Sequence, residues 1–224
     1  MTTTENFSAP ARTLDYVVVE GPIGVGKTSL AQRLADVLGS GTLLEQPMEN
    51  PFLERFYSSP KQFALPTQLF FLFQRARQIE ELKQGEMFRP GCVADFMLEK
   101  DAMFARTNLD DDELRLYEQV YAQLKLDLPV PDLVIYLQAP SDVLVERIHR
   151  RGIDYERRIE RNYLERLVDA YTQFFYDYRE APLLVVNAAE INFVDSEEDF
   201  QLLLEHIRKI RSGRHFFNPV ATAI

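Results

Sequence analysis

The chain has 224 residues, of which 46% are hydrophobic and 27% are charged, a composition typical of one globular domain. Its formal net charge of −10 argues against a protein that holds a nucleic acid polymer, because the phosphate backbone would be repelled. Cys92 is the single cysteine, so no intrachain disulfide can form, and we recognise no zinc pattern, signal peptide or membrane-spanning run. We therefore expect a cytoplasmic protein that does not enter a membrane.

The first predicted elements are a strand and a helix. Residues 1–13 are mostly polar and are expected to form a flexible tail. Residues 14–20 form a short run of apolar and β-branched residues, which indicates a strand buried on both faces of a parallel sheet. Residues 28–38 carry leucines at helical spacing, and Gly39 ends the predicted helix.

Further apolar runs indicate strands, and helical stretches separate them. The predicted strands lie at residues 42–44, 92–94, 133–137 and 183–186. The predicted helices lie at residues 63–83 and 111–126, after a Ser141 cap, around residues 163–174, and after a Ser196 cap. Short strands that alternate with helices predict a parallel sheet with helices on both faces.

Residues 21–28, GPIGVGKT, match the P-loop pattern G-x-x-x-x-G-K-[ST] between the predicted strand and helix. Gly21, Gly24 and Gly26 let the backbone curl around a phosphate chain, so that N–H groups and the positive helix end face the anion. Lys27 is then expected to reach the β- and γ-phosphates of ATP, and Thr28 to join the Mg²⁺ shell. The alternative is a glycine-rich turn without a ligand.

With this motif, the predicted fold is α/β, a P-loop NTPase-type doubly wound sheet of about five parallel strands flanked by helices. We expect a single P-loop kinase domain over residues 14–211, with an arginine-rich lid at residues 147–161 and a C-terminal tail at residues 212–224. The Asn-Lys-x-Asp segment typical of GTPases is absent from the sequence, and the chain is short for an ATPase motor. A small-molecule kinase is the class that remains.

Several segments beyond the P-loop occur in the order and spacing of one kinase family. They contain Glu45, Asn50-Pro51, Tyr57, Gln68, Arg75, Asp95, Asp101, Arg147, Arg151 and Glu156. Over residues 16–171 the chain resembles the deoxyribonucleoside kinase family, in particular its bacterial purine-directed members. The resemblance implies transfer of the ATP γ-phosphoryl group to the 5′-hydroxyl of a deoxynucleoside, preferably deoxyadenosine or deoxyguanosine, in nucleoside salvage. It also implies a homodimer formed through paired helices.

Two positions depart from the family pattern. Gln46 stands where a proline usually follows the first glutamate, and Pro47 comes one place late. Phe96 stands where the family has an arginine that helps to hold the phosphoryl region. Lys100 or an arginine of the lid is then expected to compensate.

Two acidic residues follow predicted strands on the side where ligands of open α/β sheets bind. Glu45 is expected to accept the proton of the 5′-hydroxyl, although an exposed loop glutamate is the alternative. Glu49 lies farther into the loop and is the less suitable candidate. Asp95 is expected to hold Mg²⁺ through water, and the alternative is a cap for the next helix.

The remaining predicted site residues would bind phosphates and the nucleoside. Six arginines between residues 147 and 161 form a local positive cluster, from which we assign Arg147 and Arg151 to phosphates. The resemblance implies that Tyr57 and Glu156 bind the sugar. It also implies that Gln68, Arg75 and Asp101 bind the base edge.

Two other functions fit part of this pattern. A nucleoside monophosphate kinase of the thymidylate-kinase type shares the P-loop and lid, but binds the acceptor phosphate with an arginine where this chain has Phe96. It also needs no base at Glu45. A regulatory nucleotide-binding module without turnover would not need Glu45, Asp95 and the lid arginines together.

Overall fold

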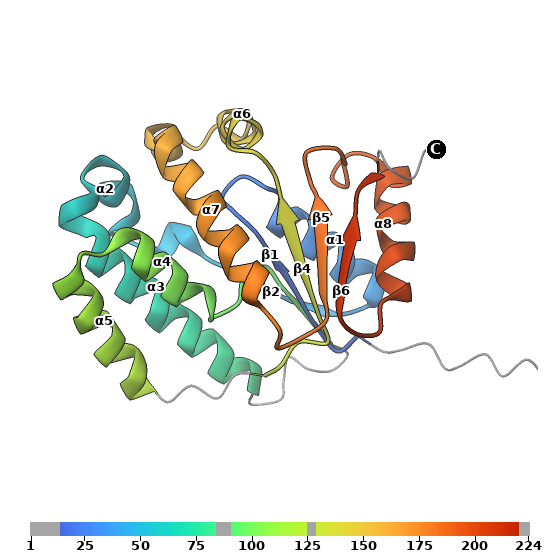
Figure 1. The fold of residues 1–224 in the computed structure, drawn as a ribbon, viewed down its shortest axis with the longest axis horizontal. Coiled ribbons are helices and arrows are strands. Elements are labelled where there is room, and N and C mark those ends of the chain that lie inside the picture. The colour runs from blue at the N-terminus through green and yellow to red at the C-terminus, as the bar shows by residue number, and fades with distance from the viewer. Residues whose placement is uncertain (1–13, 84–90, 125–128, 220–224) are drawn as a thin grey trace, which may run out of the picture.

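The computed structural model describes residues 14–83, 91–124 and 129–219, and its centre is one parallel sheet (Figure 1). Six strands pair in the order β2-β3-β1-β4-β5-β6, and every neighbouring pair is parallel. The strands are β1 (Tyr16–Glu20), β2 (Gly41–Leu43), β3 (Cys92–Ala94), β4 (Leu133–Gln138), β5 (Leu183–Asn187) and β6 (Arg214–Phe217). The order places β1, which leads into the P-loop, near the middle of the sheet.

β1 shows why the sheet is covered on both faces. All five of its residues are buried, as expected for a β-branched run in a parallel sheet. Val17 and Val19 pack in one core cluster, whereas Tyr16 and Val18 pack in the other. Successive side chains of a strand point to opposite faces, so one short run supplies both cores.

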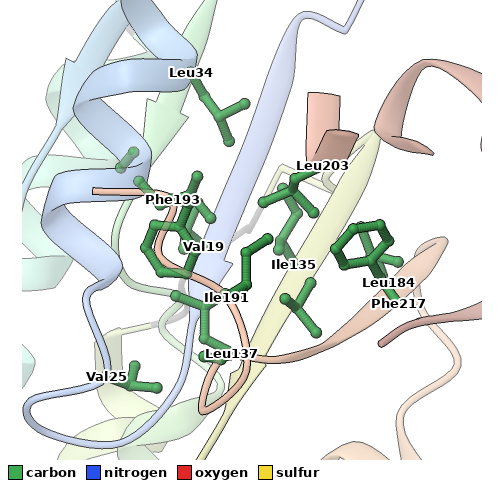
Figure 2. Packing of buried hydrophobic residues seen from close by; sticks show 14 of the residues in the cluster. Val19, Val25, Leu34, Ile135, Leu137, Leu184, Ile191, Phe193, Leu203 and Phe217 are labelled. Carbon is green, nitrogen blue, oxygen red and sulfur yellow. The ribbon is translucent and has the colours of Figure 1, made fainter. Parts of the chain in front are cut away.

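Helices form a layer on each face of the sheet (Figure 1). The first core contains residues of α1 (Lys27–Leu38), α6 (Ser141–Arg151) and α8 (Glu197–Lys209). Figure 2 shows part of this core, where Leu34 and Leu203 approach Val19 and Ile135 of the sheet. The second core contains residues of α3 (Pro60–Lys83), α4 (Lys100–Asn108), α5 (Asp111–Leu124) and α7 (Arg161–Asp177).

A third, smaller core joins the lid to the rest of the fold. It packs Phe56 of α2 (Leu53–Ser58) against Tyr163 and Leu167 of α7. The lid itself contains a 3₁₀ helix, η2 (Asp154–Arg158), and a second 3₁₀ helix, η1 (Pro47–Glu49), follows β2. The region predicted as a lid is therefore the end of α6, η2 and the start of α7.

The helix ends agree with most of the predicted caps. α1 ends at Gly39, which has the left-handed conformation (φ 63°), and the Ser196 hydroxyl accepts a hydrogen bond from the Asp199 amide at the start of α8. The predicted Ser141 cap is wrong, because Pro140 holds the cap position and Ser141 is the first residue of α6. α3 begins at Pro60, before the predicted start, since proline is tolerated in the first turn.

The C-terminal segment differs from the prediction of about five strands followed by a tail. Residues 214–217 form β6, which pairs in parallel with β5, and Phe217 is buried in the first core. Four residues with one inward aromatic ring give too weak a sequence pattern for a strand to be recognised. The predicted tail at residues 1–13 and the end of the predicted helix at residues 125–126 lie outside the described residues, and the single-domain division stays a prediction.

The described helices include none that is long and apolar enough to cross a lipid bilayer. The longest of them, α3, carries several charged residues along its length.

Candidate active site

The P-loop connects β1 to α1 and requires glycine at defined positions. Gly24 and Gly26 have φ values of +84° and +104°, a region that residues with a side chain rarely adopt. A Cβ atom on Gly24 would lie 2.8 Å from Cγ1 of Ile148, so α6 also leaves no room for one. Within the loop, Lys27 Nζ donates to the carbonyl oxygens of Gly21 (2.8 Å) and Pro22 (3.2 Å). The lysine ammonium therefore lies against the inner side of the loop.

Two cavities meet at the P-loop. The first lies among the loop, α2, α3, α4 and α7, and the second lies among the loop, α6 and residues 189–195 after β5. Both are lined by Gly24, Lys27, Thr28 and Arg151. Two ligands that occupy these cavities would therefore meet beside Lys27 and Arg151, which is the arrangement that a phosphoryl transfer needs.

Thr28 and Asp95 bring two oxygen atoms that could bind a metal ion together where the cavities meet. Thr28 Oγ1 donates to Asp95 Oδ2 at 2.5 Å, and the Glu45 amide donates to Asp95 Oδ1 at 2.7 Å. Burial raises the pKa of the Asp95 carboxyl. The cap alternative for Asp95 is wrong, because Glu99 holds the cap position of α4. A hydroxyl and a carboxylate are hard ligands that fit Mg²⁺, which takes its other ligands from water and substrate phosphates.

Glu45 follows β2 and lines the first cavity, as a residue that acts on a bound acceptor must. Its Oε1 accepts hydrogen bonds from the Arg75 guanidinium (Nε at 2.9 Å) and lies 3.3 Å from Lys100 Nζ. Burial alone would raise the pKa of Glu45, but Arg75, Lys100 and Lys27 together hold it well below its usual range. The carboxylate is therefore ionised at neutral pH.

Glu49 differs from Glu45 in its surroundings. Its side chain is 52% exposed, and it accepts a hydrogen bond from Gln74 Nε2 at 3.0 Å. It is not among the residues that line the first cavity. Only Glu45 of this pair faces the space beside the P-loop.

Arg75, Asp101 and Gln68 form one buried group beside Glu45. Arg75 pairs with both Glu45 and Asp101, so the base-edge pair expected from the sequence is joined directly to the predicted catalytic carboxylate. Gln68 Nε2 donates to the Asp101 backbone oxygen (3.2 Å) and to its Oδ1 (2.9 Å). Asp101 therefore holds the amide nitrogen of Gln68, whose side chain is part of the cavity wall.

Asp101 lies behind the cavity rather than in its wall. It is fully buried and is absent from the cavity lining, whereas Gln68 and Arg75 are both part of that lining. Burial raises the pKa of Asp101 to about 6, although Arg75 and Lys100 oppose that shift. Asp101 is therefore placed to orient the two residues that can touch a ligand.

The lid contributes Arg151 and Glu156 to the first cavity, and its Tyr155 supports an aromatic ring of the cavity wall. Arg151 Nε donates to Glu156 Oε2 at 3.0 Å, and both side chains line the first cavity. Tyr57 lines the same cavity and stacks on Tyr155, with ring centroids 6.1 Å apart. Because Tyr155 belongs to the lid, this contact joins α2 to the lid at the cavity.

Arg147 lines the second cavity, and its guanidinium binds backbone carbonyl oxygens. It donates to the carbonyl oxygens of Val25 (3.2 Å) and Ala188 (2.7 Å), which ties the P-loop to the segment after β5. The other arginines of the cluster pair at the exposed surface; examples are Arg150 with Glu146 and Arg161 with Glu165.

Two buried residues that the sequence did not mark as a pair also belong to the site. Glu20 ends β1 immediately before the P-loop, and Lys100 opens α4 and lines the first cavity. Their side chains pair at 3.1 Å. Phe96 is buried in the second core and is not part of the cavity wall.

The family model for the deoxynucleoside kinases matches residues 17–212. The chain belongs to the deoxynucleoside kinase family. It is similar to the deoxyguanosine kinase of Bacillus subtilis, with 33% identity over 207 residues that cover 88% of this chain and 98% of that protein. Membership makes it a deoxynucleoside kinase, an ATP-dependent phosphotransferase, and gives no support to the thymidylate-kinase alternative.

Two solved structures of the deoxyadenosine kinase from M. mycoides have the same fold. One contains the products dCMP and a flexible dCDP, with a TM-score of 0.74, 25% identity, and coverage of 87% of this chain and 100% of that one. The other contains dATP, with a TM-score of 0.73, 25% identity, and coverage of 87% and 99%. The expected P-loop NTPase-type α/β fold is thus confirmed, with six strands in place of about five.

Arg75→Met is expected to lower the free energy of unfolding by about 3–5 kcal/mol, because the buried carboxylates of Glu45 and Asp101 would lose their shared cation. Urea unfolding followed by circular dichroism measures this change. Arg77→Met is the matched control on the same helix, because Arg77 is 64% exposed and should change stability by less than about 0.5 kcal/mol. Equal effects of the two substitutions would contradict the role given to Arg75.

Proposed function

We propose that this chain transfers the γ-phosphoryl group of ATP to the 5′-hydroxyl of a purine deoxynucleoside. The observation that carries the proposal is the pair of cavities that meet at Lys27, Thr28 and Arg151, with Glu45 in the wall of the first. In this assignment the second cavity holds ATP and the first holds the deoxynucleoside. The reaction would supply deoxynucleoside monophosphates for salvage.

On the donor side, the P-loop binds the phosphates of ATP. Gly21, Gly24 and Gly26 give the loop its curl, and Lys27 supplies positive charge to the β- and γ-phosphates. Arg151 lines both cavities and is therefore the lid residue best placed to follow the phosphoryl group during transfer. The assigned role of Arg147 is to keep the loop in place beside the donor nucleotide, since its donors already bind backbone oxygens.

Thr28 and Asp95 would hold Mg²⁺. When bound, the ion neutralises charge on the β- and γ-phosphates. The hydrogen bond between the two side chains supports this assignment, because it holds both oxygens at the point where the cavities meet.

On the acceptor side, the Glu45 carboxylate accepts the proton of the 5′-hydroxyl as its oxygen bonds to the γ-phosphorus. Tyr57 and Glu156, from α2 and the lid, bind the sugar, and the ring of Tyr57 leaves little room for a 2′-hydroxyl. Arg75 and the amide oxygen of Gln68 offer a donor and an acceptor to the base edge.

The choice of a purine follows from the relatives. The B. subtilis relative is a deoxyguanosine kinase and the M. mycoides neighbour is a deoxyadenosine kinase. In this chain, Gln68 and Arg75 match an edge that combines an exocyclic group with a ring nitrogen. Cytosine offers a similar edge, so the choice of a purine depends on the relatives.

The proposed assembly is a homodimer. Phe73 of α3 and Leu116 of α5 are both about half exposed, and the two helices pack against each other. A partner that covers this surface would bury both side chains. The cytoplasmic location stays a prediction.

One panel of assays tests the function. ATP consumption is measured with each deoxynucleoside and with each deoxynucleoside monophosphate in turn. We expect turnover with deoxyadenosine or deoxyguanosine and none with a monophosphate as acceptor. Turnover with thymidine monophosphate alone would overturn the proposal, and so would the lack of turnover with every deoxynucleoside.

Glu45→Gln is expected to lower kcat by about 10²-fold or more, the usual scale for a positioned general base, while the affinity for the nucleoside is kept. The substitution preserves the size of the side chain and removes only its ability to take the proton. Steady-state kinetics and nucleoside binding are measured together. Glu49→Gln is the control from the same loop and should keep normal kcat; an unchanged kcat in Glu45→Gln would disprove the assignment.

Asp101→Ala is expected to reduce the preference between nucleobases. The buried carboxylate fixes the amide of Gln68 and the guanidinium of Arg75, so its removal frees both groups proposed to read the nucleobase. The ratio of kcat/KM for the preferred purine to that for thymidine should fall by an amount equivalent to about 1–3 kcal/mol. Asp111→Ala, on the exposed start of α5, should leave the ratio unchanged. Equal losses for all four bases, or a wild-type preference for thymidine, would contradict this role.

A further inference from the structure

Lys100 is a buried lysine in the wall of the first cavity, which the proposed function assigns to the deoxynucleoside. Only 2% of its side chain is exposed, although a lysine is rarely buried without a charged partner. It lines the first cavity together with Lys27, Glu45, Asp95 and Arg151. Burial disfavours its charge, but Glu20 and Glu45 outweigh this effect and hold the pKa of Lys100 above its ordinary value. The side chain is therefore an ammonium ion within the site.

Glu20 fixes the position of this ammonium group. Its Oε1 lies 3.1 Å from Lys100 Nζ and accepts a hydrogen bond from the Met97 amide at 3.0 Å. Its Oε2 accepts from the Gly21 amide (2.9 Å) and from the Tyr171 hydroxyl (3.0 Å). One fully buried carboxylate thus connects Lys100 to three parts of the fold: the first residue of the P-loop, the segment after β3, and α7. The position of the ammonium group is therefore fixed relative to the P-loop.

The second partner of Lys100 shows where its charge acts. Lys100 Nζ lies 3.3 Å from Glu45 Oε1, the oxygen that also faces Arg75. A hydroxyl that gives its proton to Glu45 must lie within hydrogen-bond reach of that carboxylate. A hydroxyl in that position is then also close to the Lys100 ammonium group. An ammonium group has three donors, and the two carboxylates account for two of them, so one donor can meet an oxygen of the substrate.

The other cations in the wall of this cavity have different second partners. Arg75 also bonds to Glu45, but its second partner is Asp101, which lies behind the cavity. Arg151 binds Glu156, and Lys27 binds carbonyl oxygens of the P-loop. Lys100 is the cation in this wall that joins Glu45 to Glu20, the residue immediately before the P-loop.

We propose that Lys100 is a catalytic residue that contacts the phosphoryl group as it reaches the acceptor oxygen, and that Glu20 is its positioning residue. This inference rests on the proposed function. In the step, the bond from the acceptor oxygen to the γ-phosphorus forms, the bond to the bridging oxygen of ADP breaks, and the hydroxyl proton goes to Glu45. Lys100 keeps its proton throughout and supplies positive charge to the phosphoryl oxygens.

Mutant cycles separate this role from a purely structural one. Lys100→Met is introduced into the wild type, into Glu20→Gln and into Glu45→Gln, and single-turnover rates are measured with excess enzyme. We expect Lys100→Met to lower the rate by about 10²-fold in the wild type and in Glu45→Gln, the usual scale for one lost donor to the transition-state charge. The loss should be smaller but still present in Glu20→Gln, because the ammonium group there has already lost its positioning carboxylate. No loss in the Glu20→Gln background would mean that Lys100 only neutralises Glu20. No loss in the Glu45→Gln background would mean that it acts only through Glu45. Either result overturns the proposal.

Binding provides a readout that does not depend on turnover. Lys100→Met should weaken the binding of the deoxynucleoside 5′-monophosphate by about tenfold or more, and that of the deoxynucleoside by much less, because only the former has a phosphate beside the ammonium. Lys61→Met, an exposed lysine of α3, is the control, and Lys100→Gln, which also removes the charge, replaces Lys100→Met if the latter does not fold. Equal weakening of both ligands would overturn the proposal. If the wild type phosphorylates the deoxynucleoside and Lys100→Met does so at the same rate, the proposed function stands and the role of Lys100 fails.

Discussion

A series of buried ion pairs holds the wall of the first cavity together. It runs from Glu20 through Lys100, Glu45 and Arg75 to Asp101, so negative and positive groups alternate along it. Taking such charges out of water costs several kcal/mol per ion, and the cost is offset only where each charge meets more than one partner. The three residues in the middle of this series, Lys100, Glu45 and Arg75, each have two charged partners. The pairing therefore fixes the relative positions of the P-loop, the end of β2, α3 and α4.

This arrangement links the two ends of the substrate. In the proposed function Glu45 acts at the phosphoryl end of the first cavity and Gln68 at the nucleobase end, and Arg75 bonds both to Glu45 and to Asp101, which holds Gln68 from behind the wall. A bound nucleobase that shifts Arg75 would therefore change the surroundings of the Glu45 carboxylate. Binding energy from a remote part of a substrate can in this way align the reacting group, which is how enzymes convert recognition into rate.

The parallel sheet explains why these groups meet at all. Glu20 ends β1, Glu45 follows β2 and Asp95 follows β3, and the carboxyl ends of parallel strands share one edge of a sheet. The chain order β1, β2, β3 becomes β2-β3-β1 in space, so Asp95 lies between the other two strand ends. Its two carboxylate oxygens accept from Thr28 on one side and from the Glu45 amide on the other.

The sequence by itself determined the P-loop and the alternation of strands and helices, because these depend on local patterns. It also indicated the candidate residues Glu45, Asp95 and Arg151 from their places along the chain, and Gln68 and Arg75 through the resemblance to a kinase family. Strand β3 was predicted at its observed residues, since three buried apolar residues give a clear signal. Only the tertiary structure decided that Arg75 joins Glu45 to Asp101, that Asp101 lies behind the cavity, and that Lys100 faces it. These partners are far apart in sequence, and buried charges pair according to the packing of α3 and α4 on the sheet, which no local pattern records.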